Sequence, residues 1–155
     1  MVDIGDDYMP GVGLGVIILN EENKVLLILR NDDAKLADSD MRLEGTWTLP
    51  AGKIKTNETI FEAAKRKVFQ EVGLEISDLE IVSIADDINE YAHFVTIGIL
   101  AHEFKGEVSL GDTQEHVAYD YFSLDELPKN LCDPSEKIIY NYLQKILYKE
   151  DKYGK

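Results

Sequence analysis

One amphipathic segment, marked at both of its ends, limits the folds that this chain can adopt. Thr59 is a residue type that caps helix N-termini, and Glu62 three residues later completes a capping box. Gly73 stands where a left-handed residue ends many helices. The apolar residues between these ends recur at helical spacing on one face, namely Ile60, Phe61, Ala64, Val68 and Val72. The segment therefore predicts a helix with one buried face, which other elements must cover.

Apolar runs on both sides of this helix predict the elements that cover it. Residues 31–45 are polar and irregular, and connections of this length are often functional or mobile. A break at residues 50–52 is expected to end the strand before it. Strands are expected at residues 11–19, 25–30, 46–49, 79–85, 93–101 and 117–122.

The last predicted element is a second helix, which starts at residues 133–136 with an acidic cap and a proline in its first turn. The order strands, helix, strands, helix predicts an α+β fold in which a mixed β-sheet is sandwiched between helices (α/β/α). Because no linker-like tract divides the 155 residues, residues 1–155 are expected to form a single domain. The last helix is expected to bury Ile138, Ile139, Tyr142, Leu143 and Ile146.

The formal charge of −14 argues against an electrostatic grip on DNA or RNA, because an acidic surface repels polyanions. A small phosphorylated ligand remains compatible with this charge if a divalent cation screens it. No apolar run approaches the roughly 20 residues of a membrane helix, and the acidic start lacks the pattern of a secretory signal. We therefore expect a cytoplasmic protein with no membrane and no nucleic acid polymer as partner. The lone Cys132 agrees with a reducing compartment, and an inert structural role is favoured over a catalytic thiol.

Residues 52–74, GKIKTNETIFEAAKRKVFQEVGL, carry a spaced pattern of glycine, charged and aliphatic positions. The pattern resembles the Nudix box, G-x5-E-x7-R-E-U-x-E-E-x-G-U, in which U is aliphatic. The flanking segments GTWTLPAG and SLDELP extend the resemblance over most of the chain. The chain is therefore identified as a member of the Nudix hydrolase (MutT-like) family. The positions that match the box are Gly52, Glu58, Arg66, Val68, Glu71, Gly73 and Leu74.

This resemblance implies a Nudix fold and a hydrolase that depends on Mg²⁺ or Mn²⁺. Such an enzyme cleaves the pyrophosphate bond of a nucleoside diphosphate linked to another group, and hydrolysis of a nucleoside triphosphate to the monophosphate is the leading hypothesis. The metal ion would stabilise the phosphate charge and activate a water molecule. The implied partner is a small-molecule nucleotide, and a homodimer stays open.

The box departs from the family at two metal-binding positions. Positions 67, 70 and 71 stand at i, i+3 and i+4, so their side chains meet on one helix face at the rim of the core. The family has glutamate at all three, whereas this chain has Lys67, Gln70 and Glu71. A protonated lysine cannot ligate a metal, and glutamine offers only a neutral carbonyl oxygen. The three positions carry no net charge where three glutamates would carry −3, which predicts weak metal binding.

Other groups can complete the site. The resemblance assigns three metal ligands, which are the carbonyl of Ala51 and the carboxylates of Glu71 and Glu115. The two glutamates are also the predicted catalytic pair. Small members of the family often take a further carboxylate from a loop before a late strand, and Asp112 and Glu107 are the alternatives to Glu115 there.

Three cations are predicted to bind substrate. Lys53 and Arg30 are expected to contact phosphate, although each stays open as a solvent-exposed charge. Lys67 could replace the charge of the missing metal and contact phosphate directly. This last possibility supports a second hypothesis, a non-catalytic Nudix-fold module that binds a nucleotide without hydrolysing it. The box positions with an expected structural role are Gly52, Glu58, Arg66 and Gly73, with Glu58 paired to Arg66.

The nucleotide base is expected near residues 91–97, YAHFVTI, which resemble a strand of Nudix enzymes that act on nucleoside triphosphates. His93 and Phe94 are neighbours in this strand, so they face opposite sides. The sequence leaves open which of them faces the ligand, and it leaves open ordinary core packing for both.

Overall fold

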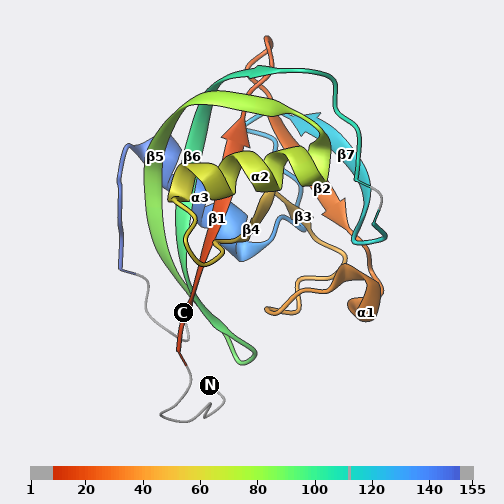
Figure 1. Cartoon of the computed structure of the whole chain (residues 1–155), viewed down its shortest axis with the longest axis vertical. Coiled ribbons are helices and arrows are strands. Elements are labelled where there is room, and N and C mark those ends of the chain that lie inside the picture. Colours follow the sequence, from red (N-terminus) through yellow and green to blue (C-terminus); the bar gives the residue numbers. More distant parts are fainter. Residues whose placement is uncertain (1–8, 112, 151–155) are drawn as a thin grey trace.

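The computed structural model describes residues 9–111 and 113–150, and within them the chain forms seven strands and three helices (Figure 1). None of the helices in these two stretches is long and apolar enough to cross a membrane. The helices are α1 (Ala34–Ala37), α2 (Ile60–Val72) and α3 (Asp133–Gln144). The strands are β1 (Gly11–Ile18), β2 (Val25–Arg30), β3 (Trp47–Thr48), β4 (Ala51–Lys53), β5 (Glu75–Ile88), β6 (His93–Lys105) and β7 (His116–Phe122).

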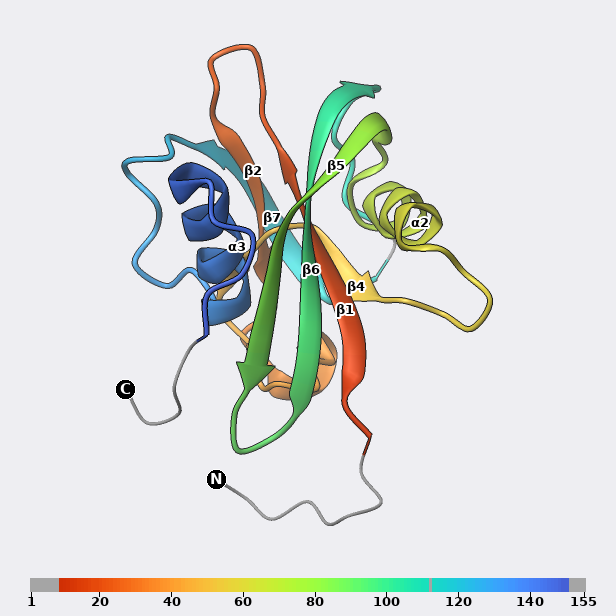
Figure 2. The ribbon, with the colours of Figure 1, turned by 90° about the vertical axis from the view of Figure 1, so that its left-hand side faces the viewer.

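The strands form two sheets. One is mixed, with the order β4-β1-β6-β5, in which β1 and β6 are parallel and the other neighbours are antiparallel. The other is antiparallel, with the order β3-β2-β7. Figure 2 shows α2 and α3 on opposite sides of the strands. The predicted α+β fold, a mixed sheet between helices, is confirmed, and the smaller second sheet is an addition to it.

Strand β1 is buried on both faces, and it connects two hydrophobic cores. Val16 and Ile18 belong to the core that includes α2, whereas Ile17 belongs to the core that includes α3. This division follows from the alternation of side chains along a strand. Burying one such aliphatic side chain contributes about 1.5–3 kcal/mol. The two cores therefore fix α2 and α3 to β1. The site described below lies between these two helices.

Both ends of α2 have the predicted caps. The Thr59 hydroxyl accepts a hydrogen bond from the Glu62 amide at 3.1 Å, and the Glu62 carboxylate accepts one from the Thr59 amide at 2.8 Å. Gly73 ends the helix in the left-handed region, with φ 74°. The prediction for Phe61 was wrong, because this side chain is 38% exposed and the buried face turns towards Ala63 instead.

Further differences lie where the apolar pattern is weak. Strands β5 and β6 continue beyond their predicted ends, because they pair with each other along almost their whole length. Residues 51 and 52, predicted as part of a break, belong to β4 on the edge of the mixed sheet. The expected loop at residues 31–45 contains the short helix α1. In α3, Leu143 is 46% exposed rather than buried, and the helix ends before Ile146 because Lys145 is left-handed.

Helix α3 lies close to the mixed sheet where two glycines leave room for it. A Cβ atom at Gly15 would lie 2.8 Å from Cδ1 of Ile138, and one at Gly98 would lie 2.7 Å from its Cγ2. Non-bonded carbon atoms pack at about 3.5–4.0 Å, so any side chain at either glycine would push the helix away. The first turns of α3 are therefore held against the sheet, where they close one end of a cleft.

Candidate active site

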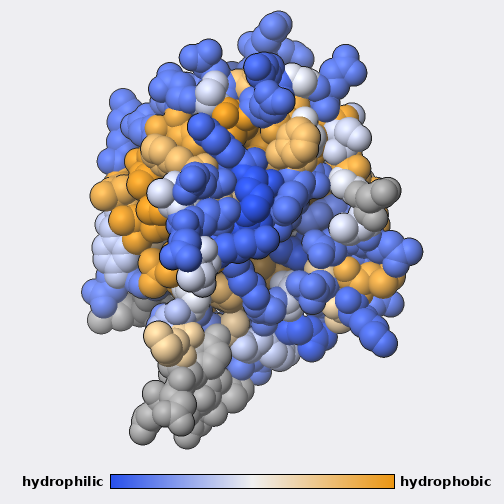
Figure 3. All heavy atoms as spheres, viewed as in Figure 1, coloured by the Kyte–Doolittle hydropathy of each residue, from blue (hydrophilic) through white to orange (hydrophobic). Residues whose placement is uncertain are grey.

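A cleft of about 570 Å³ lies between β1, α2 and the start of α3, and residues 38–41 form part of its wall. Five of its charged side chains are cationic and four are anionic, although the whole chain carries −14. On the face that carries α2, hydrophilic side chains cover the centre of the molecule (Figure 3). Cations gathered in a cleft attract anionic ligands. The charged residues that line it are Arg30, Asp38, Asp40, Lys53, Lys55, Arg66, Lys67, Glu71 and Glu115.

Glu71 is the carboxylate that α2 contributes to this cleft. Its side chain is 8% exposed, so it lies deeper than the rim of the core at which the sequence placed it. The Ala51 amide donates a hydrogen bond to Oε1 at 2.9 Å, and Nζ of Lys67 lies 3.6 Å from Oε2. Burial raises the pKa of Glu71 to about 7, although Lys67 and the Ala51 amide oppose the shift. Glu71 is buried because the apolar stripe of α2 and β4 enclose it on the inner side of the helix.

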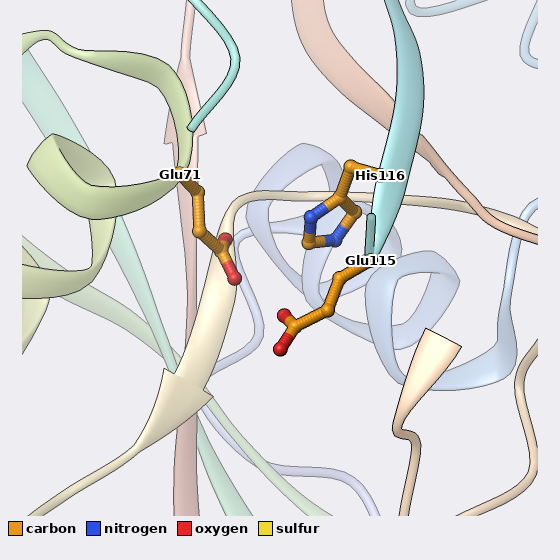
Figure 4. Close-up of side chains that lie close together, drawn as sticks. All are labelled: Glu71, Glu115 and His116. Carbon is orange, nitrogen blue, oxygen red and sulfur yellow. The ribbon is translucent and has the colours of Figure 1, made fainter. Parts of the chain in front are cut away.

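Glu115 and His116 reach the same place from the other side, where β7 begins (Figure 4). One ligating atom from each of Glu71, Glu115 and His116 lies within 4.8 Å of the others. Burial lowers the pKa of His116 to about 4, and the charges of Arg30 and Lys67 lower it further. The imidazole is therefore neutral near pH 7, with a nitrogen lone pair free to bind.

The sequence prediction missed His116. The sequence placed Glu115 in the loop before a late strand and assigned no role to His116. Glu115 lies just before β7, and the pairing of β2 with β7 shifts register between Leu29 and Arg30, opposite His116. Both side chains lie close to Glu71 beside this irregularity. A β-bulge of this kind leaves little trace in the sequence, and the adjacency of His116 to Glu115 was the one available signal.

Glu58 and Arg66 fix the loop between β4 and α2. The Arg66 guanidinium donates to both carboxylate oxygens of Glu58, at 2.6 and 2.9 Å, and to the Lys53 carbonyl at 3.0 Å. The Lys55 amide also donates to Glu58 at 2.9 Å. The hydrogen bond from Arg66 and the one from Lys55 hold the pKa of Glu58 at about 2. The ion pair expected from the sequence is present, and it positions the loop that carries Lys53.

Replacing Glu58 with glutamine is expected to lower the melting temperature at pH 7. The carboxylate has a pKa of about 2 in the folded protein and an ordinary one when unfolded, so its ion pair stabilises the fold above about pH 4.5. That stabilisation is lost as the pH falls towards 2. Melting curves between pH 2 and 7 should therefore show a weaker acid dependence for Glu58→Gln than for the natural protein. Equal slopes would contradict this role, and Glu103→Gln, an exposed glutamate on β6, is the control.

Gly52 provides room for Lys67. A Cβ atom at position 52 would lie 2.1 Å from Cε and 2.7 Å from Cγ of Lys67. The lysine stem therefore lies across the backbone of β4, and its ammonium group extends towards Glu71. In this position the cation stands beside the carboxylate that the Nudix box would use to hold a metal.

The other two predicted cations differ in how firmly they are held. Arg30 donates to the Ala37 carbonyl at 2.9 Å, and its Nε is buried without a hydrogen-bond partner among the described residues. The Lys53 side chain is 64% exposed, and its ammonium group pairs with Asp40. A phosphate oxygen could therefore reach Lys53 after Asp40 is displaced, whereas Arg30 is fixed against α1.

Residues 38–43 are held across the mouth of the cleft by contacts at two places. Besides the pair between Asp40 and Lys53, Asn89 donates to the Met41 carbonyl at 3.0 Å. The Arg42 guanidinium also lies 5.4 Å from the centre of the Tyr91 ring. These last contacts tie the segment to the turn between β5 and β6.

Apolar side chains line the cleft among the charged ones. Phe94 lines it together with Gly13 and Thr96, and Nζ of Lys53 lies 6.0 Å from the centre of the Phe94 ring, so of the two neighbours His93 and Phe94 it is Phe94 that faces the cleft. Gly13 forms the floor, and a Cβ atom there would meet nothing closer than the Gly52 carbonyl at 3.4 Å. Other uncharged residues that line the cleft include Met41, Leu43, Cys132, Pro134, Ser135 and Ile138.

Cys132 is a buried member of this wall. Its side chain is 3% exposed, and its thiol donates to the Ser135 hydroxyl at 3.3 Å. Ser135 in turn accepts a hydrogen bond from the Leu49 amide at 2.9 Å. These contacts connect the start of α3 to the strand before β4, which agrees with the structural role favoured for the cysteine.

The structure brings most of the predicted site residues to one place. Glu58 and Gly73 lie outside the cleft lining, just before the N-cap of α2 and at the end of α2. Gln70 is exposed and does not line the cleft, and Glu107 is also exposed. Asp112 lies outside the described residues. The predicted residues that line the cleft are Arg30, Ala51, Gly52, Lys53, Arg66, Lys67, Glu71 and Glu115.

The donor groups at this place fit a divalent cation. Two carboxylates and one imidazole converge within 4.8 Å, and such groups are ordinary ligands for divalent metals. The ammonium group of Lys67, 3.6 Å from Glu71, opposes a second positive charge. The residues can therefore hold an ion, with less negative charge around it than three box glutamates would supply.

Comparisons with known proteins find similar sequences. ADP-ribose pyrophosphatase from Methanocaldococcus jannaschii is 30% identical over 82% of this chain and 70% of that protein. NAD-capped RNA hydrolase NudC from Pseudomonas aeruginosa is 29% identical over 77% of this chain, which spans only 42% of NudC.

Solved structures share the fold. The MutT NUDIX hydrolase from Burkholderia pseudomallei has a TM-score of 0.76 and 28% identity, with 86% of this chain and 98% of that chain covered. The MutT protein from Methanosarcina mazei Go1 has a TM-score of 0.77 and 20% identity, with 91% and 98% covered. The sequence model of the NUDIX domain matches residues 9–142, which include every residue of the cleft. The chain belongs to the NUDIX family.

Proposed function

We propose that this protein is a metal-dependent hydrolase that cleaves the pyrophosphate bond of a nucleoside diphosphate derivative. The leading substrate is a nucleoside triphosphate. Water adds to one phosphorus while the bond to the bridging oxygen breaks, which gives the nucleoside monophosphate and pyrophosphate. The observation that carries the proposal is the convergence of Glu71, Glu115 and His116 in a cleft that also holds Arg30 and Lys67.

Each charged group has a proposed task in this reaction. Glu71 and the Ala51 carbonyl would hold the cation, and Glu115 would act as a ligand or as the base that takes the proton from the attacking water. Arg30 and Lys53 would bind the phosphate oxygens and keep the reacting phosphorus in place. When bound, Mg²⁺ or Mn²⁺ supplies the charge that stabilises the transition state. Phe94 and the other apolar side chains that line the cleft would contact the nucleotide base.

A panel of nucleotides tests the proposal. It contains the nucleoside triphosphates, ADP-ribose and NAD, because named relatives act on the last two kinds of group. Product release would be measured with Mg²⁺ and with Mn²⁺, using chromatography to separate monophosphate from diphosphate products. Metal-dependent formation of a monophosphate from one of these compounds is the expected result. No turnover of any of them with either ion would contradict the proposed hydrolase.

The protein without nucleotide is expected to bind Mg²⁺ weakly, because α2 supplies a single carboxylate beside the cation of Lys67. Nucleotide should strengthen this binding, since Mg²⁺ sites commonly take oxygens from substrate phosphates. Calorimetry with and without a non-hydrolysable triphosphate measures the Mg²⁺ dissociation constant in each case. A Mg²⁺ site of low-micromolar affinity in the nucleotide-free protein would mean that other oxygens complete the shell.

A second candidate function is favoured by one observation. Nζ of Lys67 lies 3.6 Å from Glu71, so its positive charge takes the place that a metal ion would have beside this carboxylate. A lysine there can bind phosphate without a metal, so the protein would recognise a nucleotide without hydrolysing it. Nucleotide affinity measured in excess chelator separates the two functions, because a hydrolase that depends on its metal should lose most of its affinity there.

We also propose that residues 1–155 act as a single Nudix domain in the cytoplasm, with a small-molecule nucleotide as ligand. The formal charge of −14 supports a small ligand over a nucleic acid polymer. A homodimer stays a prediction, and light scattering of the purified protein tests it.

A further inference from the structure

The ligands that meet in the cleft are not those of a three-glutamate box. Helix α2 supplies Glu71 alone, because position 67 is lysine and Gln70 is exposed outside the cleft. The remaining two ligating groups come from residues 115 and 116, at the start of β7. One of them, His116, is a nitrogen ligand. The site therefore differs from an all-oxygen site in the chemistry of its ligands as well as in its charge.

The spacing of the three groups suits one ion. At bond lengths of about 2.0–2.2 Å, two ligands of an octahedral ion stand about 3 to 4.4 Å apart. The ligating atoms of Glu71, Glu115 and His116 lie within 4.8 Å of one another, so small rotations of these side chains would close the shell. In Figure 4, Glu71 approaches from α2 and the other two approach from the opposite side, with their ends directed to a shared gap.

The backbone holds the β7 side of the site in place. The Asn31 amide donates to the Glu115 carbonyl at 2.8 Å, and its side-chain amide donates to the Gln114 carbonyl at 2.9 Å. His116 pairs with Arg30 at the end of β2. Residues 114–116 are therefore fixed to β2 and the loop after it, which lowers the entropy lost when an ion binds.

The imidazole discriminates between metal ions, whereas the nearby charges do not. Lys67 repels every divalent cation to a similar extent, so it lowers all affinities together. Mg²⁺ requires oxygen ligands and gains little from nitrogen. First-row transition ions bind imidazole well, and their affinity rises from Mn²⁺ towards Co²⁺ and beyond. Exchange of box carboxylates for His116 therefore moves the preference of the site away from Mg²⁺.

We propose that His116 is a metal ligand, and that Glu71, Glu115 and His116 form a site selective for first-row transition ions over Mg²⁺. The inference rests on the proposed function only in placing a divalent cation in this cleft. It adds a ligand and a selectivity that the Nudix box does not supply.

The test measures binding of the metal alone to the full chain, without nucleotide and without turnover. Co²⁺ and Mg²⁺ would be titrated into the natural protein and into His116→Gln, using calorimetry and, for Co²⁺, visible absorption. We expect Co²⁺ to bind at least tenfold more tightly than Mg²⁺, and His116→Gln to lose at least tenfold of the Co²⁺ affinity with less than threefold change for Mg²⁺. His102→Gln, an exposed histidine on β6, is the matched control and should change neither.

Proton NMR of the Co²⁺ form supplies a second measurement that does not depend on how a variant folds. A metal-bound imidazole gives strongly shifted ring resonances, and those of His116 should be shifted while those of His102 are not. Unshifted His116 resonances, or equal Co²⁺ affinity in His116→Gln and the natural protein, would overturn the inference. Hydrolysis with Mg²⁺ that survives His116→Gln would leave the proposed function standing, so the two can fail separately.

Discussion

Replacing Glu71 with glutamine is expected to lower kcat/KM for nucleotide hydrolysis at least 100-fold, which corresponds to about 2.7 kcal/mol of transition-state stabilisation. Glu71 is the single carboxylate that α2 brings into the cleft, so no neighbour on the helix can replace it. Glutamine has nearly the same shape but no charge to hold a cation. Initial rates on the best substrate of the panel give the ratio, and full activity in the variant would remove Glu71 from the proposed site.

The same substitution should stabilise the metal-free fold at high pH. The pKa of Glu71 is raised to about 7 in the folded protein, whereas the unfolded carboxyl titrates near 4.5. The folded state therefore binds this proton more tightly, so the stability that it contributes is complete below about pH 4.5 and is lost as the pH rises through 7. Glutamine stays neutral, and it can still accept the hydrogen bond from the Ala51 amide.

The expected difference is roughly 3 kcal/mol in favour of Glu71→Gln at pH 8, and it should vanish near pH 4.5. Urea unfolding in excess chelator at both pH values measures it. Glu103→Gln, which changes an exposed glutamate on β6, should leave both activity and stability unchanged. A variant less stable than the natural protein at pH 8 would mean that the attraction between Glu71 and Lys67 exceeds the cost of burial.

The double substitution Lys67→Glu with Gln70→Glu restores the glutamates of the Nudix box. If the protein is a hydrolase, kcat/KM with Mg²⁺ should rise at least tenfold, about 1.4 kcal/mol. Lys67 lines the cleft and Gln70 does not, so Lys67→Glu alone should give most of the gain. Rates of the single and double variants with Mg²⁺ test this expectation.

The same variants separate the two candidate functions. If Lys67 binds phosphate in a non-catalytic module, Lys67→Glu should instead abolish nucleotide affinity in chelator. The matched control is Lys65→Glu, which makes the same charge change at an exposed position of α2. If neither rate nor affinity responded to Lys67→Glu, the function would lie outside this face of α2.

The sequence predicted those features that local periodicity or ligand chemistry determines. Helix α2 and its caps followed from spacing and from the chemistry of Thr59 and Gly73. The meeting of Lys67 and Glu71 in one cleft followed from their separation of four residues. Both predictions needed only residues close together in the chain.

The missed features depend on contacts between distant segments. The burial of Glu71 depends on β4, a strand whose three residues contain no apolar repeat. His116 lies opposite Arg30, where the register of β2 against β7 shifts. The placement of residues 38–43 depends on Asp40, which pairs with Lys53. None of these pairings leaves a period that a single sequence can reveal.

Gly13 gives this protein a way to change its substrate range through a single codon. The space beside the nearby Gly11 is occupied by Phe94, and the space beside Gly15 is occupied by Ile138. A side chain at either position would therefore disturb the packing. A Cβ atom at position 13, which lines the cleft, would instead make ordinary van der Waals contacts, at 3.4 Å with the Gly52 carbonyl and 3.8 Å with Phe94. Alanine, serine or valine there would make the cleft shallower in steps while both cores stay intact. Selection for a smaller ligand would therefore meet little cost in folding at this position.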